Sequence, residues 1–275
     1  MLATLAAVSY GLSDFIGGLL SRRLAPWSVA VVAQVSSVVV TAALAAFVAG
    51  RPTATDFVWA AFAGIGSGVG TGFLFRGLAG GRMGVVAPVS AVGAAIVPVL
   101  AGLLAGERPD LPVWLGILVA FPAIWLVASE PPSHLGHQPA ASGAVDGVLA
   151  GLGFGLMFAA LGQLPDSAGM WPLALTQVCA VLSAVVLAVV LRTDWIPRTR
   201  ATWWALCSGP LGASATILFL LAAQRGYLTV TGVIASLYPA ATIVLAASIL
   251  RERVHLRQGL GLLLCGAAVT LVAVG

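Results

Sequence analysis

The chain is a series of long apolar segments joined by short polar connections. A transmembrane helix needs about 20 apolar residues, and this length predicts ten spans. They are Leu2–Leu20, Trp27–Ala49, Phe57–Ala79, Met83–Ala105, Pro112–Ala128, Val148–Leu164, Trp171–Leu191, Thr202–Ala223, Val230–Leu250 and Leu256–Val274. Because the connections are short, neighbouring helices should be antiparallel. We therefore expect an all-α membrane protein.

The composition excludes an ordinary soluble domain. Of the 275 residues, 60% are hydrophobic and 8% are charged, against about 25% charged residues in soluble domains. All thirteen Lys or Arg positions are arginine, which, with the abundance of Ala, Gly, Val and Leu, suggests a GC-rich bacterial genome. The net charge of +4 does not indicate nucleic-acid binding, because the arginines lie in short connections, where they orient helices. We expect a monomeric, multi-pass protein of the bacterial inner membrane, surrounded by the lipid bilayer.

Landmarks recur along the chain at a nearly constant offset. At an offset of 145, Glu107-Arg108 matches Glu252-Arg253, Gly116 matches Gly261, and Leu126–Ala128 matches Leu271–Ala273. At an offset of 144, Tyr10-Gly11 matches Phe154-Gly155 and Trp27 matches Trp171. Chance similarity between Leu- and Ala-rich helices is the alternative, but it does not explain the fixed register. The pattern predicts one five-helix repeat over 1–128, a linker over 129–145 and a second repeat over 146–275.

Each predicted repeat has an odd number of spans, so the second must be inverted relative to the first. The arginines at odd-numbered connections are Arg22, Arg23, Arg76, Arg82, Arg192, Arg198, Arg200, Arg251, Arg253 and Arg257, and those at even-numbered connections are Arg51, Arg108 and Arg225. This bias predicts that the odd connections are cytoplasmic and that both termini lie outside. Inverted repeats are typical of alternating-access transporters, whose substrate site lies near the bilayer midplane between the repeats.

One carboxylate, Asp14, falls well inside an apolar span. An ionised carboxylate at the centre of a bilayer is unfavourable by about 2.5–3.5 kcal/mol on insertion scales, so it should face protein or water. Tyr10, Ser13, Asp14 and Gly17 are spaced to share one face of a helix. We interpret this face as part of a substrate or proton site. Alternatively, Asp14 is hydrogen-bonded at a helix contact or wetted near an interface.

Other candidates for the site come from equivalent positions and from helices with prolines. Phe154, Met157 and Phe158 are the repeat equivalents of Tyr10, Ser13 and Asp14. Aromatic faces beside a carboxylate would suit an organic cation, an amine or an amino acid, although each aromatic ring could simply be a packing residue. Further polar candidates are Gln34, Gln177, Ser90, Ser236 and Tyr238, any of which could bond to a helix carbonyl instead.

The remaining features indicate structure rather than chemistry. Prolines at 88, 98, 122, 210 and 239 should bend their helices, and glycines at 64, 68 and 72 should let helices pack closely. Glu107-Arg108 is interpreted as a loop clamp. Three separate cysteines are expected to be small core residues, and His134 and His137 in the linker are weak evidence for a metal. We expect no metal site and no cofactor.

The two five-helix halves, each with a Glu-Arg loop followed by a Leu-Gly helix, resemble EamA-type members of the drug/metabolite transporter superfamily over essentially the whole chain. The segment from Ser13 to Arg22 is also similar to the first helix of small multidrug resistance proteins. In those proteins a membrane-embedded acid binds protons and cationic substrates in turn, a role that falls by analogy on Asp14. The EamA family is usually drawn with both termini in the cytoplasm, whereas the arginine distribution predicts the reverse.

The resemblance implies a secondary carrier, most often an exporter of amino acids, metabolites or drugs. Our hypothesis is proton antiport through Asp14 by alternating access. The alternative within the class is an uncoupled facilitator of a neutral or zwitterionic metabolite. An intramembrane enzyme is a remote alternative, because no His or Cys is spaced to act with Asp14.

Overall fold

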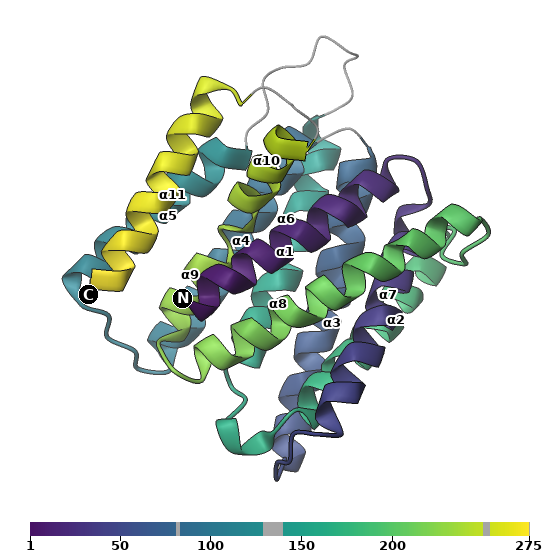
Figure 1. Cartoon of the computed structure of the whole chain (residues 1–275), viewed down its shortest axis with the longest axis horizontal. Helices are drawn as coiled ribbons and strands as arrows, with labels where there is room; N and C mark the ends of the chain where they lie inside the picture. The colour runs from purple at the N-terminus through teal and green to yellow at the C-terminus, as the bar shows by residue number, and fades with distance from the viewer. Residues whose placement is uncertain (81–82, 129–139, 250–253, 275) are drawn as a thin grey trace.

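A computed structural model describes residues 1–80, 83–128, 140–249 and 254–274. Within these residues the chain forms α-helices and two short 3-10 helices (Figure 1). The elements are α1 (Leu2–Ser21), α2 (Pro26–Ala45), α3 (Ala54–Ala79), α4 (Met83–Leu104), α5 (Leu111–Ala128), α6 (Ala140–Leu161), η1 (Asp166–Ala168), α7 (Trp171–Val190), η2 (Arg200–Cys207), α8 (Ser208–Ala223), α9 (Leu228–Ala235), α10 (Tyr238–Ile249) and α11 (Leu256–Val274).

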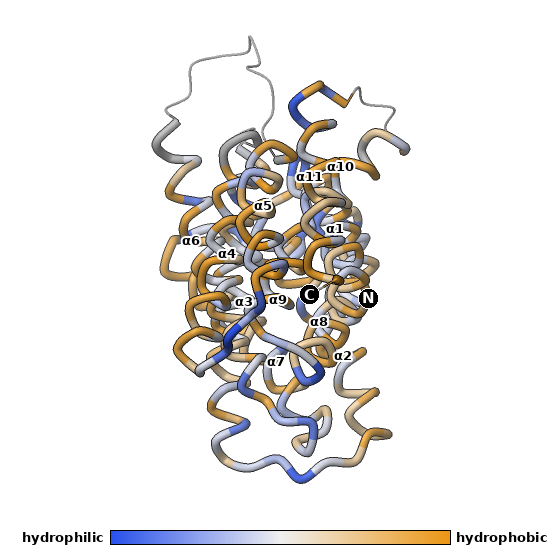
Figure 2. Tube along the Cα trace, turned by 90° about the vertical axis from the view of Figure 1, so that its left-hand side faces the viewer, coloured by the Kyte–Doolittle hydropathy of each residue, from blue (hydrophilic) through white to orange (hydrophobic). Residues whose placement is uncertain are grey.

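The described residues contain nine helical segments long and apolar enough to cross a bilayer, and α5 is a shorter apolar helix. Hydrophobic residues dominate these helices, and many hydrophilic ones lie in the connections (Figure 2). The all-α, ten-span prediction is therefore confirmed. Three spans differ in detail from their predictions, one of them the ninth, which is described below. The helix of the sixth begins earlier, at Ala140, and the eighth starts as the 3-10 helix η2 before α8.

The two halves are inverted repeats. Helix α1 and its counterpart α6 run in opposite directions across the bundle (Figure 1). The packing repeats as well: α3 packs on α6 and α7, while its counterpart, α8, packs on α1 and α2. Both repeats therefore contribute helices to the centre of the molecule.

The contact between α5 and α11 shows this symmetry at atomic detail. A Cβ on Gly116 would meet Val272, and a Cβ on Gly261 would meet Val127. Each glycine thus packs against a valine near the C-terminal end of the other helix. The two glycines, like the two valines, are 145 positions apart, which is the repeat offset. The Leu-Gly landmarks recur because each end of this crossing needs a residue without a side chain.

The ninth span is broken between α9 and α10. Pro239 has no N–H, so it cannot donate to the carbonyl four residues earlier. Instead, Leu237 N–H donates to Ile234 O at 3.1 Å and Ala240 N–H to Leu237 O at 2.9 Å. Helix α1 packs against this break: Thr242 Oγ1 donates to Gly11 O at 3.3 Å. Broken helices near the midplane are typical of secondary transporters.

Helix α3 carries the glycines that allow close packing in the centre. A Cβ on Gly64 would lie 2.3 Å from Thr176 O, and one on Gly68 would lie 2.4 Å from Ala180 O, both in α7. On the adjacent face, a Cβ on Gly66 would lie 2.5 Å from Gly153 O in α6. The helices therefore approach at backbone distance, which brings the two repeats together around their interior face.

Two polar contacts join the repeats near the ends of the helices. Glu107 accepts the backbone N–H groups of Leu228 at 2.5 Å and Thr229 at 2.9 Å, so it caps α9 from the connection after α4. The Arg76 guanidinium forms an ion pair with Asp146 and lies 4.4 Å from the centre of the Phe73 ring. The expected role of Glu107 as a clamp therefore corresponds to these two hydrogen bonds, which hold the start of α9 to the connection after α4. Its counterpart, Glu252-Arg253, lies outside the described residues, as do His134 and His137.

Not every expectation about packing holds. Cys265 is buried and Cys179 is partly buried, but Cys207 is exposed. Its position at the end of η2, in the first part of the eighth span, explains this exposure. The prediction that all three cysteines are core residues is therefore wrong for Cys207.

Candidate functional site

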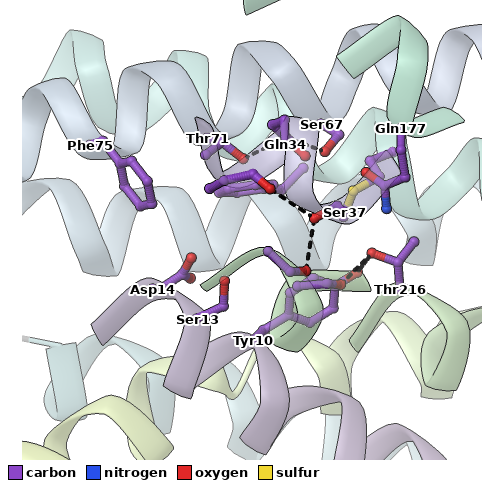
Figure 3. Close-up of a pocket in the computed structure, with 15 residues that line it drawn as sticks. Tyr10, Ser13, Asp14, Gln34, Ser37, Ser67, Thr71, Phe75, Gln177 and Thr216 are labelled. Carbon is purple, nitrogen blue, oxygen red and sulfur yellow. Dashed lines mark hydrogen bonds between the residues drawn. The ribbon is translucent and has the colours of Figure 1, made fainter. Parts of the chain in front are cut away.

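A small polar cavity lies between the two repeats. Its volume is about 40 Å³, enough for roughly three water molecules. The residues that line it come from α1, α2 and α3 of the first repeat and α6, α7 and α8 of the second. They are Tyr10, Ser13, Asp14, Ala33, Gln34, Ser37, Ser67, Thr71, Phe75, Phe154, Met157, Gln177, Gly209, Gly212 and Thr216 (Figure 3).

Asp14 contributes the carboxylate of this cavity. Helix α1 places it one turn beyond Tyr10 and one turn before Gly17. A Cβ on Gly17 would lie 2.1 Å from the Phe75 ring, so this glycine is what lets the ring approach α1 beside Asp14. Among the described residues, Asp14 forms no hydrogen bond and no ion pair, and no dashed line reaches it in Figure 3. Its carboxylate is therefore open to a ligand or a proton.

Near Asp14, hydroxyl groups of α1 and α2 form hydrogen bonds with α8. Tyr10 Oη donates to Thr216 Oγ1 at 3.2 Å, and Thr216 Oγ1 donates to Gly212 O at 2.8 Å. Ser13 Oγ donates to Ser208 O at 3.1 Å, and Ser37 Oγ donates to Gly209 O at 2.8 Å. These bonds tie the first repeat to α8 and fix the side chains around the carboxylate.

The two glutamines of the cavity have different surroundings. Gln34 Nε2 donates to Ser67 Oγ at 3.1 Å and to Thr71 Oγ1 at 3.3 Å. Gln177 is 2% exposed, yet it forms no hydrogen bond with any described residue, and Figure 3 draws none to it. The near-equivalent positions in the two repeats thus give one amide held by α3 and one left open to the cavity.

The aromatic candidates divide between the cavity and its support. Phe154 and Met157 line the cavity. Phe158 lies behind Tyr10, with ring centroids 5.7 Å apart, and stacks on Phe219 at 4.3 Å. The packing alternative therefore describes Phe158, whereas Phe154 and Met157 present an aromatic and a sulfur surface to whatever occupies the cavity.

Three polar candidates form a separate group. Ser90 Oγ lies 3.0 Å from Tyr238 Oη, and the Tyr238 ring lies 6.3 Å from the Phe154 ring. Ser236 Oγ donates to Gly232 O at 2.8 Å, in its own helix. None of the three is among the cavity-lining residues. For Ser236 the structure follows the alternative of a helix-carbonyl bond, while Ser90 and Tyr238 satisfy each other behind Phe154.

Sequence reasoning missed five lining residues with functional groups or rings: Ser37, Ser67, Thr71, Phe75 and Thr216. Two signals were available. Ser37 lies three positions after Gln34, on the same helix face, and Ser67 and Thr71 are four positions apart on the glycine-rich α3. Hydroxyls at helical spacing beside close-packing glycines therefore mark the wall of the cavity.

The model of the EamA-like transporter family matches residues 1–129 and 141–274. This chain belongs to the EamA-like transporter family. The family is part of the drug/metabolite transporter superfamily, so the protein is a multi-pass membrane transporter. No curated protein sequence matches the chain. A solved crystal structure, described only as that of a protein, shares 15% sequence identity and a TM-score of 0.72, over 99% of this chain and 96% of its own. At that identity the likeness shows a shared fold alone.

A second hollow in this EamA-like transporter lies between α1, α10 and α11. Its volume is about 470 Å³ and its lining is apolar apart from Thr4 and Cys265. Val8 and Val244, which line it, are themselves about half exposed on the lateral surface. It therefore lies at the lateral surface of the bundle, between α1 of the first repeat and helices of the second, and it offers no charged group to a polar substrate.

The described residues hold no group of three or more His, Cys, Asp or Glu side chains that could bind a metal ion. The residues that line the polar cavity of this transporter include one carboxylate and no histidine or cysteine. The cavity presents one acid, hydroxyl groups, amides and aromatic rings to a bound molecule.

Proposed function

We propose that this EamA-like transporter is a secondary carrier that exports a small organic cation or amine in exchange for protons, with Asp14 binding each in turn. The observation that carries the proposal is the carboxylate of Asp14, which lies without a cationic partner in a cavity built from both repeats. Asp14 is partly buried, and a charge held away from water without a partner is unfavourable. Either a proton or a cationic substrate relieves it, and the two compete for the same oxygens.

The rest of the cavity supports recognition of an amine. An ammonium group bound at the carboxylate would share the cavity with the rings of Phe75, Phe154 and Tyr10, and cations are attracted to aromatic faces. The hydroxyl groups and amides would accept or donate the remaining hydrogen bonds. This lining suits a small polar cation better than a large apolar one.

The size of the cavity supports alternating access. A space of about 40 Å³ is too small for an organic molecule, so the repeats must separate to admit one. The cavity is bounded by helices of both repeats, and rocking one repeat against the other would open it toward one side of the membrane at a time.

Flux through proteoliposomes tests the role of Asp14. The purified transporter is reconstituted with an internal pH dye, and pH-gradient-driven uptake of a panel of primary amines is measured for wild type and Asp14→Asn. The expected result is that Asp14→Asn loses pH-driven uptake and substrate-driven proton movement together. The control is Asp110→Asn, an exposed carboxylate in a connection, which should transport like wild type. Unchanged pH-driven uptake in Asp14→Asn removes Asp14 from the mechanism.

The facilitator of a neutral or zwitterionic metabolite is the second candidate. The cavity contains six hydroxyl side chains besides its single acid, and such a lining would also bind a neutral polar molecule. In this case wild-type uptake would reach the same plateau with and without a pH gradient, and no proton movement would accompany substrate.

A further inference from the structure

Only two polar side chains of the cavity lack a hydrogen-bond partner among the described residues: the Asp14 carboxylate and the Gln177 amide. Every other polar side chain in the lining donates or accepts a hydrogen bond. Figure 3 places Asp14 and Gln177 on opposite sides of the close-up, with the hydroxyl groups between them. Asp14 comes from α1 in the first repeat and Gln177 from α7 in the second.

The comparison with Gln34 shows why the Gln177 amide is open. In the first repeat, Gln34 is held by Ser67 and Thr71 of α3. Gln177 lies 143 positions after Gln34, two short of the offset of 145 at which the residues of α8 that correspond to Ser67 and Thr71 are Gly212 and Thr216. Gly212 has no hydroxyl, and Thr216 is occupied by Tyr10 and by the Gly212 carbonyl. The second repeat has therefore replaced the partners of its glutamine.

An open amide in this position is a recognition group. A primary amide offers two N–H donors and one carbonyl acceptor. In a buried site, leaving these groups without hydrogen bonds is unfavourable. Gln177 is 2% exposed, so bulk solvent does not satisfy it. Its partner must enter the cavity, as must the partner of Asp14.

We propose that Gln177 is a specificity-determining residue that binds a second polar group of the substrate, so that the carrier prefers amines bearing a carbonyl, amide or hydroxyl group over plain alkylamines. The inference rests on the proposed function, in which Asp14 binds the ammonium group. The bound substrate would then bridge the two repeats, from α1 to α7. A substrate that contacts both repeats has the means to stabilise one arrangement of them relative to another.

Binding of two matched probe series tests the proposal. One series is ω-amino amides of increasing chain length, and the other is alkylamines with the same numbers of non-hydrogen atoms. Affinities are measured by calorimetry on the whole chain in nanodiscs, for wild type, Gln177→Met and Gln224→Met, a glutamine outside the cavity whose Nε2 donates to Leu164 O at 3.3 Å. Methionine keeps the length of glutamine and removes its hydrogen bonds. Thermal unfolding of each variant is recorded alongside.

The expected result is selective. Wild type binds the best amino amide about tenfold more tightly than its matched alkylamine, because one to two additional hydrogen bonds form. Gln177→Met removes this preference without lowering the unfolding temperature, since the amide has no protein partner to lose. Gln224→Met leaves the preference in place, because Gln224 is not among the residues that line the cavity.

Three outcomes overturn the inference. If Gln177→Met weakens both series equally, or changes neither, Gln177 does not read the second group. If the variant also unfolds at a lower temperature, its amide has a structural role filled by bound water. If wild type binds neither series, the proposed amine carrier fails as well, and this result is distinct from binding without discrimination.

Discussion

Removing the carboxylate of Glu107 should destabilise the transporter at the junction between α4 and α9. Glu107 accepts two backbone N–H groups at the first turn of α9, from Leu228 at 2.5 Å and Thr229 at 2.9 Å. Hydrogen bonds to a charged group contribute about 1.5–3 kcal/mol each. Glu107 is partly exposed, so water replaces some of this contribution. We expect Glu107→Ala to lower the free energy of unfolding by about 2–4 kcal/mol.

A second variant tests the same contact from the other side. A Cβ on Gly102 would lie 2.3 Å from Glu107 Oε2, so Gly102→Ala should displace the carboxylate and reduce stability in the same direction. Glu107→Gln keeps one oxygen acceptor, but its NH2 group would face the second backbone N–H, donor against donor. This variant should therefore lose about half as much unfolding free energy as the alanine variant. The measurement is equilibrium unfolding in mixed detergent micelles, followed by tryptophan fluorescence.

The matched control is Asp110→Asn, which removes the charge of an exposed carboxylate in the same connection and keeps a side chain suited to the position just before α5. It should unfold within about 0.5 kcal/mol of wild type, as surface substitutions usually do. If Glu107→Ala is as stable as Asp110→Asn, the Glu107 carboxylate does not hold α9.

Two further predictions concern packing and charge. Arg76→Met should destabilise the protein by about 1–3 kcal/mol, because it removes the cation paired with the buried Asp146, whose side chain is 3% exposed. The double variant Arg76→Met with Asp146→Leu should recover much of this loss. The same unfolding assay measures both variants. Gly68→Ala should impair folding, because its Cβ would lie 2.4 Å from Ala180 O in α7. Gly266→Ala, with nothing within 4 Å of its Cβ, should fold like wild type. The yield of monodisperse protein in detergent distinguishes the two variants.

The EamA-like fold explains why a polar cavity forms between the repeats of this transporter. Because α3 and α6 meet at backbone distance through Gly66 and Gly153, the helices on either side are drawn together around a narrow interior. Polar side chains that turn inward there bond to one another, to helix carbonyls such as Ser208 O and Gly209 O, or to a ligand. The unpaired carboxylate and amide are therefore the two places where a substrate would add bonds that the protein does not make for itself.

The sequence by itself determined the number of spans, the repeat and its inversion. Bilayer thickness sets the length of an apolar segment, and an odd number of spans per repeat allows only an inverted arrangement. The repeated Leu-Gly landmarks were readable for a related reason: Gly116 and Gly261 fill the same place at the two ends of one helix crossing. Family membership followed from the same features.

Only the tertiary structure decided which polar residues meet. A soluble helix shows its inner face by being apolar there, but these helices are apolar on every side, because lipid and protein interior are equally apolar. Sequence therefore could not show that Ser90 pairs with Tyr238, or that α3 supplies hydroxyls to Gln34 and α8 supplies none to Gln177. The rotation of each helix about its axis is set by close packing at glycines, and that rotation is what brought Asp14 and Gln177 into one cavity.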